Sequence, residues 1–245
     1  MNQQKLSMPV AVIITGVIIA GAIFVSNRGN SNTVAQAPTG NQPAQQAPTP
    51  QPSGSTDAVR PVTEKNHVRG DINAPVKIVE YSDFECPFCK RFHDTMKQVM
   101  DEYGEDGRVA WVYRHFPLEQ LHPVKAMREA VASECVKELG GNDAFWQFTD
   151  RFYELTPSNN RTDVDTLIPQ IVGEIGLAGA AFDECWASDR YDTHIQEDVE
   201  NAIATGGRGT PWSIVIGPDG TTYPLSGAQP YEAVKQLIEL ALASE

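Results

Sequence analysis

The pattern of hydrophobic and polar residues divides the chain into three parts. Residues 9–25 are almost wholly apolar, and residues 26–63 are polar with no apolar periodicity. From there to residue 245, apolar positions recur at the steps of helices and strands, which is the pattern of segments that bury one face. We therefore expect one folded domain at residues 64–245, preceded by two segments that lie outside its core.

The first segment, residues 1–28, predicts a membrane anchor or a signal segment. Its apolar run is near the lower limit for a membrane-spanning helix and slightly long for the core of a signal peptide. The Ala-Gln-Ala sequence at 35–37 resembles a cleavage site but lies well beyond that run. We favour an uncleaved, single-pass anchor in the cell membrane and keep a cleaved signal peptide as the alternative. The amino terminus and Lys5 precede the run, and Arg28 follows it. This weak bias of positive charge places the N-terminus inside and the rest of the chain outside the cytoplasm.

The second segment, residues 29–63, is rich in Pro, Gln, Asn, Thr, Ala and Ser. Such a composition buries too little apolar surface to offset the entropy of ordering the chain. We expect a disordered tether that holds the domain away from the membrane without fixing its orientation.

Two strands and a helix open the domain. Residues 76–82 read as a short buried strand, and residues 108–116 read as a second strand. Between them, from Pro87 onward, apolar residues recur at three- and four-residue steps as far as Gly104, a residue type that commonly ends helices. This order predicts a βαβ unit.

The remainder of the domain predicts helices followed by a hairpin. Residues from about 122 to 205 carry several apolar helical stripes, and a last helix is expected at 231–242. Residues 212–216 and 221–225 read as strands joined by a Gly-Pro-Asp-Gly turn. The order βαβ, helices, ββα indicates an α/β domain with a helical insertion between its halves.

Charge and cysteine content narrow the class of protein. The formal net charge of -13 argues against a nucleic acid or an anionic membrane surface as a partner, because such contacts need clustered Lys and Arg. The chain has four cysteines. An even number in an extracytoplasmic chain agrees with an oxidising compartment, where disulfides persist.

The sequence Cys86-Pro87-Phe88-Cys89 stands where the first strand leads into the first helix. Pro87 suits the first helical position, which needs no amide hydrogen. Cys86 then lies at the helix N-terminus, where free amides and the helix dipole favour a thiolate. We predict a lowered pKa for Cys86 with the helix dipole as the main cause. The positive charges of Lys90 and Arg91, one turn further on, are a second candidate contribution to the lowered pKa. Two cysteines at this spacing predict thiol-disulfide exchange.

A zinc site is the alternative use of such a cysteine pair. Zinc needs two further ligands nearby, and Cys135 and Cys185 are solitary, with no histidine at finger spacing. Covalent haem needs a histidine directly after the second cysteine, where Lys90 stands. We expect no metal and no cofactor.

With these motifs in place, the chain resembles the DsbA-like branch of the thioredoxin superfamily over roughly residues 61–245. The resemblance rests on the Cys86–Cys89 motif, on Glu80 six residues ahead of it, and on Gly209-Thr210-Pro211 just before a strand. It implies an α/β, thioredoxin-like fold (βαβ…ββα) with the helical insertion at about 122–205. It also implies a cis Thr210–Pro211 peptide bond.

The resemblance further implies a catalytic role for Cys86, Cys89 and Glu80, and a substrate-binding surface at Thr210, Pro211, Pro87 and Phe88. The expected function is an extracytoplasmic enzyme that oxidises dithiols of unfolded or reduced exported proteins through the Cys86–Cys89 disulfide. A membrane quinone-linked thiol oxidoreductase is the expected reoxidant. The family's Pro-His dipeptide is replaced here by Pro-Phe, so a disulfide reductase or isomerase stays open, as does a non-catalytic peptide-binding chaperone.

Strand alternation places Glu80 on the same face as Val76 and Ile78, so its carboxyl group is expected to be buried. Burial raises the pKa of a carboxyl group, which suits the transfer of the Cys89 proton that the family assigns to this position. A salt bridge to a lysine or arginine is the alternative reading.

Three further expectations concern the helices and the core. Cys135 and Cys185 lie on apolar helical stripes, and we favour a structural disulfide between them over two free core cysteines. His93 lies one turn after Cys89 on the same helix; one reading is that it tunes Cys89, and an exposed histidine is the commoner case. Aromatic side chains are expected in the core rather than in a substrate platform: Trp111, Phe145, Trp146, Trp186 and Trp212.

Overall fold

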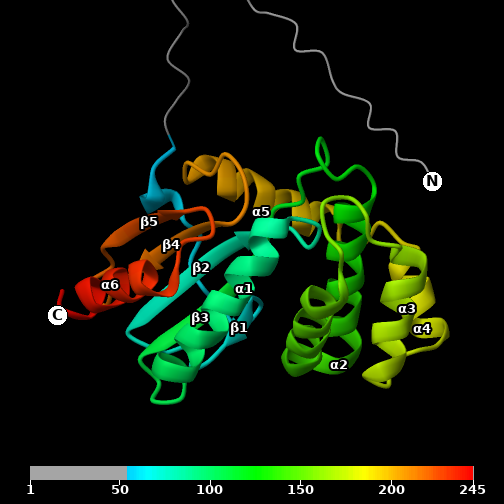
Figure 1. Cartoon of the computed structure of the whole chain (residues 1–245), viewed down its shortest axis with the longest axis horizontal. Helices are drawn as coiled ribbons and strands as arrows, with labels where there is room; N and C mark the ends of the chain where they lie inside the picture. The colour runs from blue at the N-terminus through cyan, green and yellow to red at the C-terminus, as the bar shows by residue number, and fades with distance from the viewer. Residues whose placement is uncertain (1–53, 245) are drawn as a thin grey trace, which may run out of the picture. The chain divides into compact units, whose positions relative to one another are not determined.

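The structure, a computed structural model, describes residues 54–244. The predicted anchor or signal segment at 1–28, and the predicted tether as far as residue 53, lie outside the described residues. The helices and strands follow one another as β1 (His67–Arg69), β2 (Val76–Ser82), α1 (Pro87–Val99), β3 (Val109–His115), α2 (Lys125–Leu155), α3 (Val164–Glu174), α4 (Ala180–Trp186), α5 (Asp192–Ala204), β4 (Trp212–Ile216), β5 (Thr222–Ser226) and α6 (Tyr231–Leu242) (Figure 1). This order confirms the predicted α/β fold with its helical insertion.

The strands form one mixed sheet in the order β1-β3-β2-β4-β5. Strand β2 is central: it runs parallel to β3 and antiparallel to β4, with Ile78 opposite Trp111 on one side and Val215 on the other. Every residue of β2 except Lys77 is buried. A strand covered on both faces needs a nearly continuous apolar run, which explains why this segment is easily recognised in the sequence.

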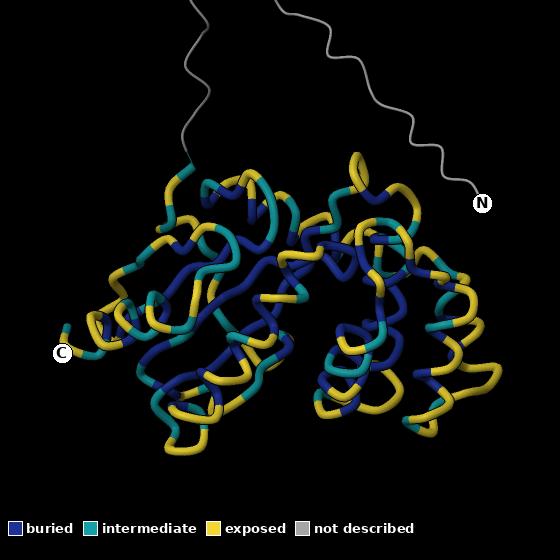
Figure 2. The backbone as a smooth tube through the Cα atoms, viewed as in Figure 1, coloured by how far each residue is buried: buried dark blue, intermediate teal, exposed yellow. Residues whose placement is uncertain are grey.

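Helices cover both faces of the sheet, and the sheet itself forms much of the buried interior (Figure 2). Val76 and Ile78 pack into one core cluster with residues of α1, α2 and α6. Val79 and Tyr81 pack into a second cluster with residues of α5. The alternation of β2 therefore directs Glu80 toward the side of the sheet that carries α1.

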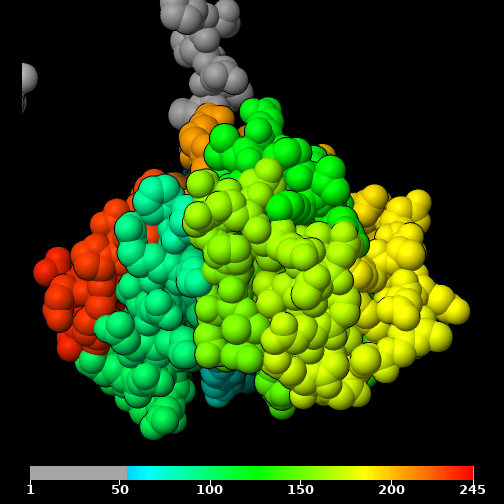
Figure 3. Space-filling model, turned by 45° about the vertical axis from the view of Figure 1, so that its right-hand side comes forward, coloured from blue at the N-terminus to red at the C-terminus, as the bar shows by residue number. Residues whose placement is uncertain are grey.

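The helical insertion comprises α2 to α5. Helix α2 lies beside α1, with α6 on the other side of α1 (Figure 3), whereas α5 packs on the opposite face of the sheet. Helix α2 bends at Gly141, whose φ of 80° is in the left-handed region that glycine adopts without steric cost. A disulfide joins Cys135 of α2 to Cys185 of α4, with the Cα atoms 5.8 Å apart. The pairing that we favoured is thus present, and both cysteines are fully buried.

The chain packs on the domain already at residues 54–63, which were expected to belong to the tether. Residues Thr56–Ala58 form a short 3-10 helix, and the amide of Ser55 donates a hydrogen bond to the carbonyl of Ala204 at 3.0 Å. Arg114 donates to the carbonyls of Arg60 and Pro61 at 2.8 and 3.1 Å. Residues 54–63 therefore pack on the domain, which corrects the predicted tether boundary at residue 63. Polar composition concealed this, because backbone groups and polar side chains make these contacts.

Two smaller features were also not foreseen. Strand β1 has only three residues, too few to show a periodic pattern, and it pairs antiparallel with β3. The helix expected to end at Gly104 is regular only to Val99 and continues as a π-helical turn at Met100–Gly104. No helix within residues 54–244 combines the length and apolar character needed to cross a membrane.

Candidate active site

The cysteine motif lies where β2 leads into α1. Cys86 is the N-cap of the helix, with extended backbone angles of -75° and 120°, and Pro87 occupies the first turn. Cys89 lies inside that turn. Both thiols are free; Cys86 is 4% exposed and Cys89 is fully buried. An incoming sulfur atom therefore reaches Cys86 first.

A second loop approaches Cys86 from the other half of the domain. It contains a cis peptide bond between Thr210 and Pro211, as the resemblance implied, and leads directly into β4. Because β4 pairs with β2, the loop is held at the end of the sheet where α1 begins. The Cys86 thiol donates a hydrogen bond to the Thr210 carbonyl at 3.4 Å.

The pKa of Cys86 is lowered to about 6, mainly by a hydrogen bond with Cys89, while burial acts in the opposite direction. The backbone amides of Cys89 and Phe88, which belong to the helix N-terminus, make smaller contributions. The predicted direction of the shift is therefore confirmed, but its leading cause is the partner thiol rather than the helix N-terminus. Burial, the hydrogen bond with Cys86 and the charge of Cys86 raise the pKa of Cys89 well above its usual value.

Glu80 lies on β2 and is 1% exposed. Its Oε2 accepts a hydrogen bond from the indole Nε1 of Trp111 at 2.9 Å. Burial raises the pKa of Glu80 to about 7, and the charge of Glu80 contributes to the raised pKa of Cys89. In residues 54–244, no lysine or arginine lies within ion-pair distance of this carboxyl group, so its environment differs from that of a salt-bridged carboxylate.

The expected substrate-binding residues fall around the two cysteines. Phe88 is 53% exposed, Pro87 is also exposed, and the Arg91 guanidinium lies 5.2 Å from the centre of the Phe88 ring. Thr210 is partly exposed and Pro211 is buried. The structure thus brings an exposed aromatic ring and a loop backbone to the same end of the domain as Cys86. Lys90 instead donates to the carbonyl of Thr156 at 2.7 Å, which anchors the insertion to α1.

His93 does not match the expectation of an exposed side chain. It is 3% exposed, its Nε2 lies 2.7 Å from Oδ1 of Asp150, and its ring centre lies 5.0 Å from that of Trp111. Burial lowers the pKa of His93. It therefore links the Glu80 partner Trp111 to α2. The other four aromatic residues named above fit their prediction: Phe145, Trp146 and Trp212 are buried, and Trp186 packs against the core.

Buried acidic residues next to the cysteine motif were missed in the sequence. Glu85, adjacent to Cys86, is fully buried and accepts the amides of Asn160 at 2.6 Å and Thr162 at 3.0 Å. Glu129 of α2 is also fully buried, and its carboxyl oxygens have no partner among the described residues. Burial, helped by the charges of Glu85 and Asp83, raises the pKa of Glu129 to about 10. Glutamates in a mixed-charge helix give no signal of burial, so this group was not recognisable.

Comparison with known proteins identifies the fold. A family model described as thioredoxin matches residues 62–239. The chain belongs to the thioredoxin family. Among solved structures it is similar to DsbA2 of Pseudomonas aeruginosa, with 28% identity and a TM-score of 0.63 over 76% of this chain and 97% of that one. BdbD of Bacillus subtilis in its oxidised form shares the fold, with 21% identity and a TM-score of 0.65 over 78% and 99% of the two chains. The chain is therefore DsbA-like, that is, a thioredoxin-family protein of the thiol-disulfide oxidoreductase type.

The matching curated relatives are much longer proteins. The chain is 42% identical over 105 residues to the Na(+)/H(+) antiporter NhaA 1 of Mycolicibacterium gilvum, covering 42% of this chain and 16% of the antiporter. It is 32% identical over 174 residues to NhaA 1 of Salinispora arenicola, covering 67% of this chain and 24% of the antiporter. The chain thus spans less than a quarter of these relatives, and their transport activity is that of the whole antiporters.

Proposed function

We propose that this DsbA-like protein oxidises paired thiols of unfolded or reduced exported proteins, outside the cytoplasm, through a Cys86–Cys89 disulfide. The observation that carries the proposal is the lowered pKa of Cys86, about 6, at a helix N-terminus beside the Thr210 carbonyl. A thiolate at this position is both a good nucleophile and a good leaving group. The assignment as a thiol-disulfide oxidoreductase holds whether the cysteine pair oxidises or reduces its substrates.

The exchange proceeds in two steps whose atoms and electrons balance. A substrate thiolate attacks the Cys86 sulfur of the oxidised enzyme, which forms a mixed disulfide and releases Cys89 as a thiolate. The second substrate thiolate then attacks the substrate sulfur of that mixed disulfide, which closes the substrate disulfide and releases Cys86 as a thiolate. Two electrons pass from the substrate to the cysteine pair. The lower the pKa of Cys86, the better it leaves in the second step.

Glu80 serves the first step. The pKa of Cys89 is high, so its thiolate needs a proton when it is released into the buried interior. With its pKa raised to about 7, Glu80 is protonated in a large fraction of molecules at neutral pH and can supply that proton. Proton transfer by Glu80 is thus favoured over a structural salt bridge by the lack of a cationic partner within residues 54–244.

The direction of transfer follows from the stability of the reduced form. Each pH unit by which the Cys86 pKa lies below the ambient pH stabilises the reduced pair by about 1.4 kcal/mol, or roughly 30 mV toward an oxidant. The buried Cys135–Cys185 disulfide supports an oxidising compartment, because structural disulfides rarely persist in the cytosol.

The surface around Cys86 supports the proposed substrate, and the family resemblance supports the proposed reoxidant. A peptide in extended conformation would lie beside the loop of Thr210 and Pro211, with Pro87 and Phe88 as the neighbouring exposed side chains. The Pro211 carbonyl already accepts the Gly227 amide at 2.9 Å, so the peptide would pair with the backbone at Thr210, next to Cys86. A membrane quinone-linked thiol oxidoreductase would restore the disulfide after each cycle. An anchor at residues 1–28 would hold the domain near that partner.

The decisive experiment is the reduction potential of Cys86–Cys89 in the full chain, equilibrated against glutathione buffers and measured by thiol trapping. A value well above the roughly -180 to -210 mV of an oxidising secretory compartment would establish a disulfide donor. A value far below that range would make the protein a reductase. A Cys86→Ser variant that still promotes client folding would instead favour the peptide-binding chaperone.

Membrane attachment needs its own test. Membranes from cells that express the full chain are extracted with alkaline carbonate, and the mass of the mature protein is measured. An intact protein that stays with the membrane supports the single-pass anchor. A soluble protein whose mass matches cleavage near residue 37 would establish a signal peptide.

A further inference from the structure

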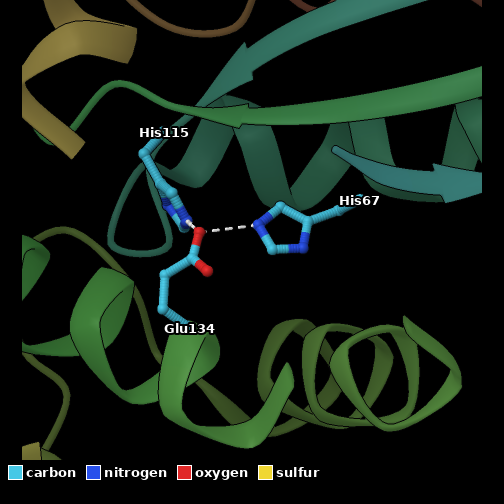
Figure 4. Close-up of side chains that lie close together, drawn as sticks. All are labelled: His67, His115 and Glu134. Carbon is cyan, nitrogen blue, oxygen red and sulfur yellow. Dashed lines mark hydrogen bonds and ion pairs between the residues drawn. The ribbon is translucent and has the colours of Figure 1, made fainter. Parts of the chain in front are cut away.

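Three histidines and one glutamate lie close together in the domain, and none of them belongs to the cysteine motif. Three of the four are buried, and His194 is partly exposed. We name them the histidine–glutamate cluster: His67, His115, Glu134 and His194. His67, His115 and Glu134 are 2%, 1% and 4% exposed, and their ligand atoms lie within 4.8 Å of one another. Figure 4 shows the two imidazole rings directed at the Glu134 carboxyl group from different sides.

Four separate elements bring these side chains together. His67 begins β1 and pairs with Tyr113 of β3, so it lies on the same side of the sheet as His115, two residues further along β3. Glu134 is in α2 and His194 is in α5. The cluster therefore joins the edge of the sheet to two helices of the insertion. Because its members are far apart in the chain, the sequence shows no ligand spacing, and no metal was expected.

All three imidazoles are directed at one oxygen atom. The distances from Glu134 Oε1 to the Nε2 atoms are 2.7 Å for His67, 3.0 Å for His115 and 3.2 Å for His194. A carboxylate oxygen offers about two lone-pair directions, fewer than the three imidazole nitrogen atoms around it. A cation at the centre would use the lone pairs of the three nitrogen atoms and of the oxygen together.

We propose that the histidine–glutamate cluster binds one divalent transition-metal ion of the zinc type. His67, His115 and Glu134 supply two imidazole nitrogens and a carboxylate oxygen within 4.8 Å of one another, and His194, 3.2 Å from the same oxygen, can turn in as a fourth ligand. Such a nitrogen-rich set is of the kind that Zn²⁺ accepts and does not suit a hard cation such as Ca²⁺, which prefers six to eight oxygen ligands. Ligands about 2.0–2.2 Å from a tetrahedral ion are about 3.3–3.6 Å apart. The three contacts to Glu134 Oε1, 2.7–3.2 Å, are shorter than that, so the ligands have to move apart by up to about 0.9 Å. Only His67, His115 and Glu134 have all their ligand atoms within 4.8 Å of one another, so the His194 side chain also has to turn toward the ion.

The surroundings predict how tightly the ion is held. The His67 ring stacks on Phe145 with ring centres 3.6 Å apart, which fixes its orientation. The Nδ1 atoms of His67 and His115, however, are buried without a partner among the described residues. Such outer contacts are worth about 10–100-fold in affinity, so we expect the affinity to be lower by that factor than in sites with complete outer contacts. His194, whose side chain is 37% exposed, provides the route of entry.

Zinc binding is tested with the full chain, purified without a histidine tag, in a Cys86→Ser/Cys89→Ser background. This background removes the reduced cysteine pair, which would otherwise bind Zn²⁺. Calorimetric titration with ZnCl₂ is expected to give one site per chain and a melting temperature that rises with zinc concentration. CaCl₂ and MgCl₂ are expected to have no effect. Titration with CoCl₂ adds a visible spectrum that reports nitrogen and oxygen coordination.

Substitutions in the same background locate the ion. Glu134→Gln and His115→Gln should abolish the zinc signal, whereas His93→Gln, the matched control at another buried histidine–carboxylate contact, should keep it. His194→Gln lies at the surface, so it will fold even if the buried variants do not, and it should weaken binding about tenfold or more. If the chain binds no zinc, or if zinc binding survives His194→Gln and Glu134→Gln unchanged, the cluster is a hydrogen-bond network and the proposal fails. Neither result depends on the direction of thiol exchange.

Discussion

The two cysteine pairs of this protein differ in almost every property that controls sulfur chemistry. Cys86 and Cys89 are free thiols in the first turn of α1, beside a loop from the other half of the domain. Cys135 and Cys185 lie within α2 and α4, are fully buried, and are bonded to each other. The residue type is the same, so reactivity comes from position.

The difference lies in what can reach and stabilise a thiolate. At Cys86, a hydrogen bond with the partner thiol and, to a smaller extent, helix amides hold the pKa at about 6, and the residue is 4% exposed. Within a helix, the backbone amides are already used by the helix itself, and burial without such donors disfavours a charged sulfur. One pair is thereby suited to exchange and the other to holding two helices of the insertion together.

Replacing Cys86 gives the largest expected effect. Cys86→Ser should lower the rate at which the oxidised protein restores disulfides in a reduced model protein by about 10³-fold or more, because the attacked sulfur is lost. The matched control is the double substitution Cys135→Ala/Cys185→Ala, which should keep the rate. Equal losses in both variants would mean that the two pairs do not differ in role.

Removing the Cys135–Cys185 disulfide tests the structural role of the second cysteine pair. The Cys135–Cys185 bond closes a sequence separation of 50, for which chain entropy gives a loss of about 4 kcal/mol in the free energy of unfolding. Guanidinium unfolding of Cys135→Ala/Cys185→Ala, compared with the parent chain, measures this loss. A variant with unchanged stability would show that the bond does not support the fold.

Much of this contrast was accessible from the sequence, because it depends on local signals. The apolar run of β2, Pro87 after Cys86 and the helical steps of α1 are neighbours in the chain, so the position of the motif followed directly. The burial of Glu80 also followed from strand alternation. The cis bond at Pro211 followed only from the family resemblance, since few X-Pro bonds are cis.

Features that depend on contacts between segments far apart in the chain could not be predicted from the sequence. Trp111 as the partner of Glu80 requires the register between β2 and β3, and the burial of His93 requires the packing of α2 against α1. The histidine–glutamate cluster draws on β1, β3, α2 and α5 at once. In each case the deciding partner lies far along the chain, and no periodic pattern reports it.

Glu80 sharpens the comparison within the reactive pair. Glu80→Gln cannot give a proton to the released Cys89 thiolate, so the first exchange step should slow by about 10²-fold. Because the pKa of Glu80 is about 7, the ratio of wild-type to variant rates should be largest below pH 7 and fall above it. Stopped-flow measurement of mixed-disulfide formation from pH 5 to 9 gives this ratio. A ratio that does not change with pH would assign Glu80 a purely structural role.

The buried carboxyl group of Glu129, near the reactive region, is expected to lower the stability of the fold at neutral pH. Its pKa rises from 4.5 to about 10 on folding, so folding requires a proton, and stability falls as pH increases between these two values. Glu129→Gln stays neutral and avoids this loss. We expect its free energy of unfolding to exceed that of the wild type by about 1–2 kcal/mol at pH 7, after allowing for water penetration, with no difference below pH 4. Urea unfolding at pH 4, 7 and 9 provides the comparison, and a difference that shrinks with rising pH would mean that the Glu129 carboxylate is ionised in the fold.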